Sequence, residues 1–133
     1  MITEDYVSFE TAKLLREKGF DERCFSFYWE DGSLDANSHD KTTDLRNSTS
    51  SSAVAPTLQM AMRWLREEKH YYIQIMLDSW ALGAHLGYYI VIQATDSDFE
   101  EISPIVDDID DVFFETPEQA AEAAIKYCLE NLV

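Results

Sequence analysis

The sequence predicts an α+β fold in which helices pack on one face of a small antiparallel sheet. Three segments place apolar residues at helical spacing behind recognisable caps, and two neighbouring segments alternate with the period of a strand. The expected helices are 9–18, 57–69 and 117–131, and the expected strands are 24–29, 71–77 and 86–94, with 112–115 as a further candidate. A chain of 133 residues fits a single α+β domain, 1–133.

The first helix is predicted from its two ends. Ser8 is a typical N-cap, Glu10 places an acid in the first turn, and Gly19 supplies a left-handed stop at the C-terminal end. Phe20 is then expected to fold back onto the helix. Residues 24–29 follow, where aromatic side chains at every second position predict a strand.

The stretch 33–54 is predicted to be a mobile loop. It contains the run Asn47–Ser52, which consists of Asn, Ser and Thr, and it has few large apolar side chains that would hold it to a core. A connection of this length is uncommon inside a compact domain and is usually either mobile or functional. The polar composition favours mobility.

The second helix, 57–69, carries an apolar stripe on one side and charged residues on the other. Thr57 offers a hydroxyl to the free N–H groups of the first turn. The stripe consists of Leu58, Ala61, Met62 and Leu65, with Trp64 at its flank. Such a stripe needs a sheet or another helix to cover it.

The segments 71–77 and 86–94 are expected to form an antiparallel hairpin. Pairing Leu77 with Leu86 collects apolar side chains on one face, whereas a slip of one residue would mix polar and apolar positions. We therefore predict that this face is buried under the helices. The opposite face is mixed, as in a sheet that has one side in water.

Residues 96–115 hold nine carboxylates and no base, yet large apolar residues are interleaved with them. A free acidic tail would not contain so many, so the segment is expected to pack on the fold, either as a short helix or with 112–115 as a strand beside the hairpin. The last helix is marked by Thr116 as N-cap, Pro117 at the first helical position and Gln119 to close a capping box.

Negative charge is high and unevenly distributed. The formal net charge is −16, and residues 96–133 hold 12 acids against the single base Lys126, a net of −11. This balance repels nucleic acid and anionic membranes and favours basic partners or cations. We therefore expect no direct nucleic-acid binding and no membrane association, and without an apolar span or leader segment we expect a cytoplasmic protein. Cys24 and Cys128 are expected to be reduced core thiols.

The segments Ala55–Glu67 and Glu122–Leu132, together with the helix end Glu17–Phe20, carry a resemblance to a known family. They are similar to segments in a family of small uncharacterised proteins of gut Bacteroides-type bacteria and their phages or mobile elements. The resemblance covers the three helices and the hairpin between the last two. It implies a bacterial or phage intracellular protein, and it carries over no activity and no site residue.

No nucleotide-binding loop, metal-spaced Cys/His set or nucleophile elbow is recognisable, so no catalytic, cofactor-binding or metal residue is assigned. His70 and His85 are expected near opposite ends of the hairpin and do not form a ligand pair. One acidic patch offers oxygen ligands to a hard cation but lacks the spacing of a calcium loop, which favours a solvated acidic face. The patch consists of Asp107, Asp108, Asp110 and Asp111.

Surface features point instead to protein binding. Side chains of the mixed sheet face and of the hairpin connection form a candidate contact set, namely Tyr72, Met76, Trp80, Leu82 and Tyr89. The alternative is that 96–115 or 33–54 folds over them. We expect a non-enzymatic interaction module that binds a protein partner or forms a homo-oligomer. A second hypothesis is an acidic DNA mimic that occupies a host nucleic-acid-binding protein, and a metal-assisted hydrolase that uses the acidic patch ranks last.

Overall fold

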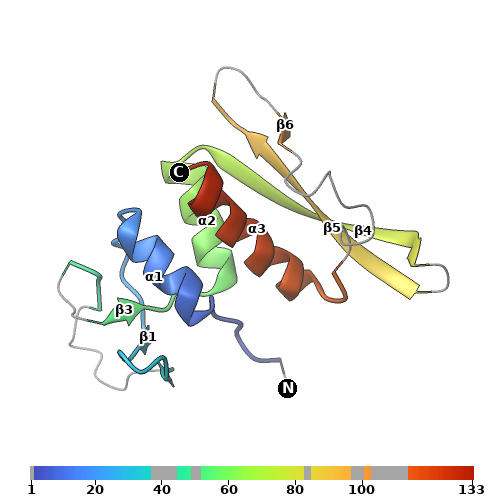
Figure 1. Ribbon diagram of the computed structural model, residues 1–133. Helices are drawn as coiled ribbons and strands as arrows, with labels where there is room; N and C mark the ends of the chain where they lie inside the picture. The colour runs from blue at the N-terminus through green and yellow to red at the C-terminus, as the bar shows by residue number, and fades with distance from the viewer. Residues whose placement is uncertain (1, 37–44, 49–51, 83–84, 97–100, 103–113) are drawn as a thin grey trace. The chain divides into compact units, whose positions relative to one another are not determined.

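The computed structural model describes residues 2–36, 45–48, 52–82, 85–96, 101–102 and 114–133, with the backbone alone for 78–82, 85–86 and 101–102 (Figure 1). In chain order the elements are α1 (Phe9–Glu17), β1 (Phe27–Tyr28), β2 (Leu34–Asp35), β3 (Ala53–Val54), α2 (Leu58–Glu68), β4 (Tyr71–Leu82), β5 (His85–Ala94), β6 (Glu101–Ile102) and α3 (Pro117–Asn131). The predicted α+β class is confirmed, and each helix matches its expected bounds to within one residue. The chain groups into two compact units, Met1–Ala61 and Met62–Val133.

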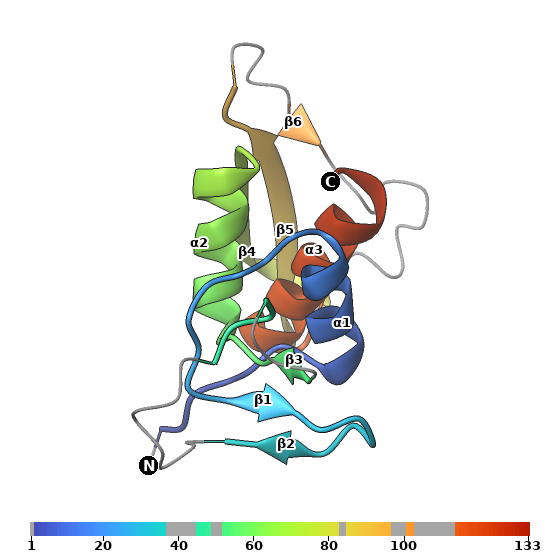
Figure 2. The same cartoon turned by 90° about the vertical axis from the view of Figure 1, so that its left-hand side faces the viewer.

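The strands form two sheets of three strands each, in the orders β2-β1-β3 and β4-β5-β6. The prediction that 24–29 joins the sheet of the hairpin is therefore wrong. β1 is shorter than expected and pairs antiparallel with β2 and β3, and Figure 2 shows it between them. The reason is local, because a tight turn at Gly32 (φ 88°), in which the Gly32 N–H donates to the Trp29 carbonyl, places β2 beside β1 within a few residues.

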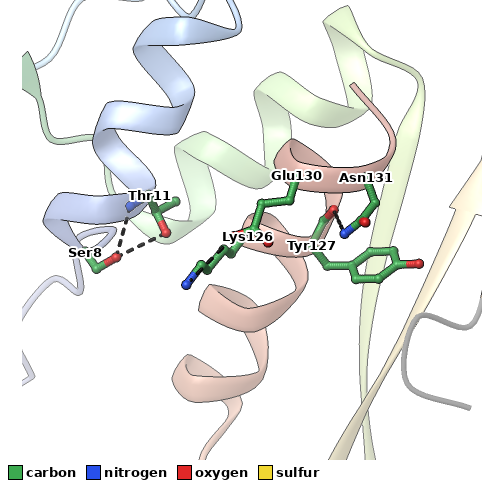
Figure 3. Close-up of polar contacts among 6 residues, drawn as sticks. All are labelled: Ser8, Thr11, Lys126, Tyr127, Glu130 and Asn131. Carbon is green, nitrogen blue, oxygen red and sulfur yellow. Dashed lines mark hydrogen bonds and ion pairs between the residues drawn. The ribbon is translucent and has the colours of Figure 1, made fainter. Parts of the chain in front are cut away.

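Both ends of α1 are capped as predicted. The Ser8 Oγ accepts a hydrogen bond from the Thr11 N–H at 3.2 Å (Figure 3). At the C-terminal end Gly19 has φ 93°, and the Phe20 N–H donates to the Leu15 carbonyl at 2.9 Å. This is the hydrogen bond of a Schellman motif, and it brings the Phe20 side chain into the core as expected. α1 packs against β3.

Two short strands lie within the stretch predicted as a mobile loop. β2 and β3 both fall within it, and Leu45 forms a backbone bridge with Cys24. The Asn47 side chain makes two further links, because its Nδ2 donates to the Phe20 carbonyl at 2.7 Å and its Oδ1 accepts from the Val54 N–H at 3.1 Å. One amide therefore ties the end of α1 to β3. The mobility of the stretch stays a prediction, and residues 37–44 and 49–51 lie outside the described residues.

α2 contains residues of both compact units. The Thr57 Oγ1 accepts a hydrogen bond from the Met60 N–H at 3.2 Å, which is the cap expected at this position. The predicted stripe is confirmed, because Leu58, Ala61, Trp64 and Leu65 are buried and Met62 is half-buried.

β4 and β5 form the predicted hairpin, but the expected register is wrong by two residues. Leu77 pairs with Tyr88, where the prediction paired it with Leu86. The strands run further toward each other than expected, to Leu82 and His85, and β4 is irregular between Asp78 and Leu82. A shift of two residues keeps every side chain on its predicted face, because side chains alternate with period two.

α3 contacts both strands of the hairpin. Its N-cap is confirmed, because the Thr116 Oγ1 accepts from the Gln119 N–H at 3.1 Å. Figure 3 shows contacts in its last turns, between Asn131 and the Tyr127 carbonyl and between Lys126 and Glu130. Buried side chains of α3 and of the hairpin form this part of the core: Ile73, Ile90, Ile92 and Ala94 with Ala120, Ala121, Ala124, Ile125, Cys128 and Leu129. α1 contacts β3, a strand of the sheet β2-β1-β3, whereas α3 contacts the hairpin.

Two parts of the acidic segment 96–115 pair with β5 on the side away from β4. β6 pairs with it, placing Ile102 opposite Ile92. Nearer the tip, Phe114 of the candidate strand 112–115 forms an isolated bridge with Tyr88, and residues 112–113 lie outside the described residues. The alternative of a short helix falls mostly on 103–113, which lie outside the described residues.

Candidate protein-interaction site

β4 is an edge strand in the part of the chain that the structure describes. β5 is its partner on one side, and β5 itself is flanked on its other side by β6 and Phe114 (Figure 1). No hydrogen bond joins the other side of Tyr71–Leu77 to any described residue. The position of β6 and Phe114 therefore decides which hairpin strand has an open edge.

The direction of the backbone groups along this edge follows from two hydrogen-bonded positions. The Thr95 N–H donates to the His70 carbonyl at 2.7 Å, so His70 and Thr95 are a hydrogen-bonded pair of the ladder. Such pairs recur at every second residue, so the even-numbered residues of β4 bond to β5. The hydrogen bonds of Tyr88 on β5 fit this alternation, because its N–H and carbonyl both bond to Phe114 and so point away from β4. By alternation the N–H and C=O groups of the odd-numbered residues of β4 point outward. They are Tyr71, Ile73, Ile75 and Leu77.

Side chains on both faces of this strand are exposed. Tyr72 is 39% exposed and Met76 is 40% exposed, and both lie on the face opposite the buried isoleucines. Leu77 lies on the other face and is 54% exposed, although Ile73 on the same face is buried. The strand from Tyr71 to Leu77 contains no charged residue and no proline.

The predicted contact residues are brought together in part. Tyr89 pairs with Met76, so Tyr72, Met76 and Tyr89 share one sheet face as expected, although Tyr89 is half-buried. Trp80 and Leu82 belong to β4, not to a loop, and their side chains lie outside the described part of the structure. The role of these five residues as contacts stays a prediction.

The electrostatic surroundings differ at the two ends of the edge. Arg66 of α2 lies over the Tyr72 ring, with its guanidinium carbon 5.9 Å from the ring centroid, a cation–π distance. Lys69 and His70 follow it in the chain, immediately before β4. Asp78 comes directly after Leu77. Glu67 and Glu68 stand between Arg66 and Lys69, so Lys69 is the charged residue nearest the start of the edge and Asp78 is the one nearest its end.

A second candidate site is a cleft in the unit Met1–Ala61 that sequence analysis missed. Its volume is about 270 Å³, and it is lined by Phe9, Lys13, Arg16, Tyr28, Trp29, Glu30, Ser52 and Ala53. The Lys13 Nζ lies 4.6 Å from the centroid of the Phe9 ring, so a cation and aromatic rings share one wall. The available signal was Phe9, Lys13 and Arg16 at helical spacing on one side of α1. This volume lies below the roughly 300–1,000 Å³ typical of ligand pockets, so the cleft is small for a ligand-binding site.

The remaining sequence candidates have no site around them in the described structure. Asp107, Asp108, Asp110 and Asp111 lie outside the described residues. Within the described ranges, no group of three or more His, Cys, Asp or Glu side chains could hold a metal ion. The backbone places His70 opposite Thr95 and His85 opposite Leu82, at the two ends of the hairpin as expected.

Both cysteines are free thiols in the core. Burial raises the pKa of the Cys24 thiol to about 12, with a further contribution from the negative charge of Glu22. Burial alone raises the pKa of the Cys128 thiol to about 12. Neither thiol is therefore a nucleophile at neutral pH, because the reactive form is the thiolate.

Comparisons with protein-family models, curated proteins and solved structures found no match to this chain. In the described part of the structure, no helix combines the length and apolar character that crossing a membrane requires. Arguments about function therefore depend on the site geometry.

Proposed function

We propose that the protein is a non-enzymatic interaction module that binds another polypeptide along the open edge of β4. The observation that carries this proposal is the row of outward N–H and C=O groups on Tyr71, Ile73, Ile75 and Leu77, which have no partner among the described residues. Such a row is a template for adding a strand.

The side chains of this edge support the proposal. Proteins usually protect an open edge with lysine, proline or inward-pointing charges, and Tyr71–Leu77 has none of these. Hydrogen bonds along the backbone would supply affinity, and the exposed Tyr72, Met76 and Leu77 would supply specificity for the side chains of the added strand. The charge-mimicry and hydrolase hypotheses depend on the acidic patch, for which the structure offers no geometry.

Affinity purification with the immobilised protein from a bacterial lysate tests the proposal. The wild type is compared with Leu77→Lys, which places a charge at the edge, and with Leu34→Lys, which makes the same charge change at a residue that is 41% exposed on β2. We expect at least one protein to be retained by the wild type and Leu34→Lys and lost by Leu77→Lys. A protein that all three variants retain equally would contradict the proposal.

Amide hydrogen exchange then tests the binding mode on the purified complex. In the free protein, the N–H groups of Tyr72, Gln74 and Met76 should be protected by β5, and those of Ile73 and Ile75 should exchange faster. On binding, protection should appear at Ile73 and Ile75. Protection confined to residues outside β4 would show that the partner binds elsewhere.

A further inference from the structure

We infer that the strand which fits the β4 edge is β4 of a second copy of this chain, paired antiparallel about a two-fold axis through Gln74. The inference rests on the proposed function of the edge and names its partner. It follows from three properties of Tyr71–Leu77: the phase of its backbone groups, the order of its side chains and the charges at its two ends.

The backbone groups satisfy each other in this register. Tyr71 of one copy faces Leu77 of the other, and Ile73 faces Ile75. All four are outward-pointing residues, so each facing pair can exchange its N–H···O=C hydrogen bonds as in an ordinary antiparallel ladder. A register with Ile73 on the axis leaves Leu77 without a partner, and one with Ile75 on the axis places Tyr71 opposite Ser79, in the irregular part of β4. The axis at Gln74 thus pairs every outward residue of the regular segment Tyr71–Leu77.

The side chains also match across this axis. Tyr72 of one copy lies beside Met76 of the other on the outer face, which joins the two exposed side chains of each copy into one apolar surface. On the inner face, Leu77 lies beside Tyr71 of the second copy. Among Tyr71–Leu77, Leu77 is the most exposed apolar side chain, so it exposes the largest fraction of its surface for burial on pairing.

The charges flanking the edge favour the antiparallel arrangement. Asp78 of one copy takes the register position opposite His70 of the other, so Asp78 lies diagonally beside Lys69. A parallel arrangement would instead place the two Lys69 residues together and the two Asp78 residues together. The net charge of −16 on each copy opposes association, but none of it comes from Tyr71–Leu77. Added salt should therefore strengthen the pairing, because it screens the general repulsion.

Disulfide trapping with Gln74→Cys tests the axis directly. In the proposed register the two copies of position 74 form a pair without mutual hydrogen bonds, with Cα atoms about 4.5 Å apart, which a disulfide can span. Tyr72→Cys is the matched control, because position 72 faces Met76 of the second copy and not itself. The buried Cys24 and Cys128 do not interfere. We expect a covalent dimer from Gln74→Cys and little from Tyr72→Cys under the same mild oxidation.

Sedimentation analysis of the unmodified chain and of charge variants gives the second readout. The wild type and Leu34→Lys should form a dimer that strengthens with salt. Leu77→Lys should weaken the dimer by about tenfold or more, because the lysine appears twice per dimer and lies near Lys69 and His70 of the second copy. Leu77→Glu should weaken it less. If net charge alone decided dimer affinity, Leu77→Glu would weaken the dimer more than Leu77→Lys, since a lysine reduces the net negative charge of each copy.

Two results would overturn the inference. One is a wild-type chain that stays monomeric at all concentrations and salts, and the other is equal trapping of Gln74→Cys and Tyr72→Cys. A monomer that still captures a lysate protein in an edge-dependent way would overturn the self-pairing and leave the proposed function intact. If neither a dimer nor an edge-dependent partner is found, both fail.

Discussion

Replacing Gly32 by alanine should destabilise the unit Met1–Ala61 more than the same change at Gly19, and the difference should come from Phe9. Both glycines have positive φ, 88° and 93°, where an alanine side chain costs about 1–2 kcal/mol. At Gly19 an added Cβ meets nothing within 4 Å, so the backbone cost is the whole effect. At Gly32 it would lie 3.0 Å from one carbon of the Phe9 ring and 3.3 Å from another.

Displacing that ring has a further cost. Phe9 packs against Tyr28 with ring centroids 5.4 Å apart, so it cannot move without disturbing a buried neighbour. Overpacking of this kind typically costs about 1–3 kcal/mol, so together with the backbone cost Gly32→Ala should cost about 2–5 kcal/mol in total. Phe9→Ala removes the ring, and in that background Gly32→Ala should cost no more than Gly19→Ala does.

Urea unfolding followed by circular dichroism measures these free energies in the two single glycine variants, Phe9→Ala and the double variant. The expected signature is a coupling energy of about 1–3 kcal/mol between positions 9 and 32, with none between 9 and 19. The reasoning would be refuted if Gly32→Ala cost no more than Gly19→Ala in the wild-type background, or if the coupling were absent.

Two other predictions concern a half-buried amide and two buried thiols. Asn47→Asp should destabilise the protein by about 1–3 kcal/mol at neutral pH, because the amide that donates to the Phe20 carbonyl becomes a carboxylate; the loss should shrink on acidification, whereas the neighbouring Ser48→Ala should change urea stability little. The thiols of Cys24 and Cys128 have pKa values raised from 9.0 to about 12, so the unfolded chain loses these protons first and stability should fall as pH rises from about 9 toward 12. Cys128→Ala should reduce that slope, and an unchanged slope would show that the Cys128 thiol contributes nothing to it.

The helices were predictable because their signals are local. Ser8, Thr57 and Thr116 each cap the helix that follows them, and Gly19 ends α1 by its own backbone conformation. The buried face of the hairpin was predictable for a similar reason, since alternation assigns each side chain to a face whatever the partner strand does.

The register and the sheet arrangement depend on contacts between distant residues. A two-residue shift leaves the same apolar side chains on the same face, so the pattern could not distinguish Leu86 from Tyr88 as the partner of Leu77. The two links made by Asn47 join residues far apart in the chain, and composition alone made that stretch look unstructured. The contact residues on one sheet face were predictable in part, but the open edge of β4 depends on Phe114 and β6 lying beside β5.

α2 has a consequence for how the two compact units fold. The boundary between them falls after Ala61, four residues into a helix of 11 residues, Leu58–Glu68. A single helical turn is too short to persist in water, because nucleating a helix costs more than one turn returns. Cutting the chain at this boundary would therefore leave the buried Leu58 and Ala61 of the first unit without the helix that holds them in place. It would also separate the helical residues of the second unit from their N-terminal cap at Thr57. The two units thus share a folding element, and neither is a natural fragment for expression by itself.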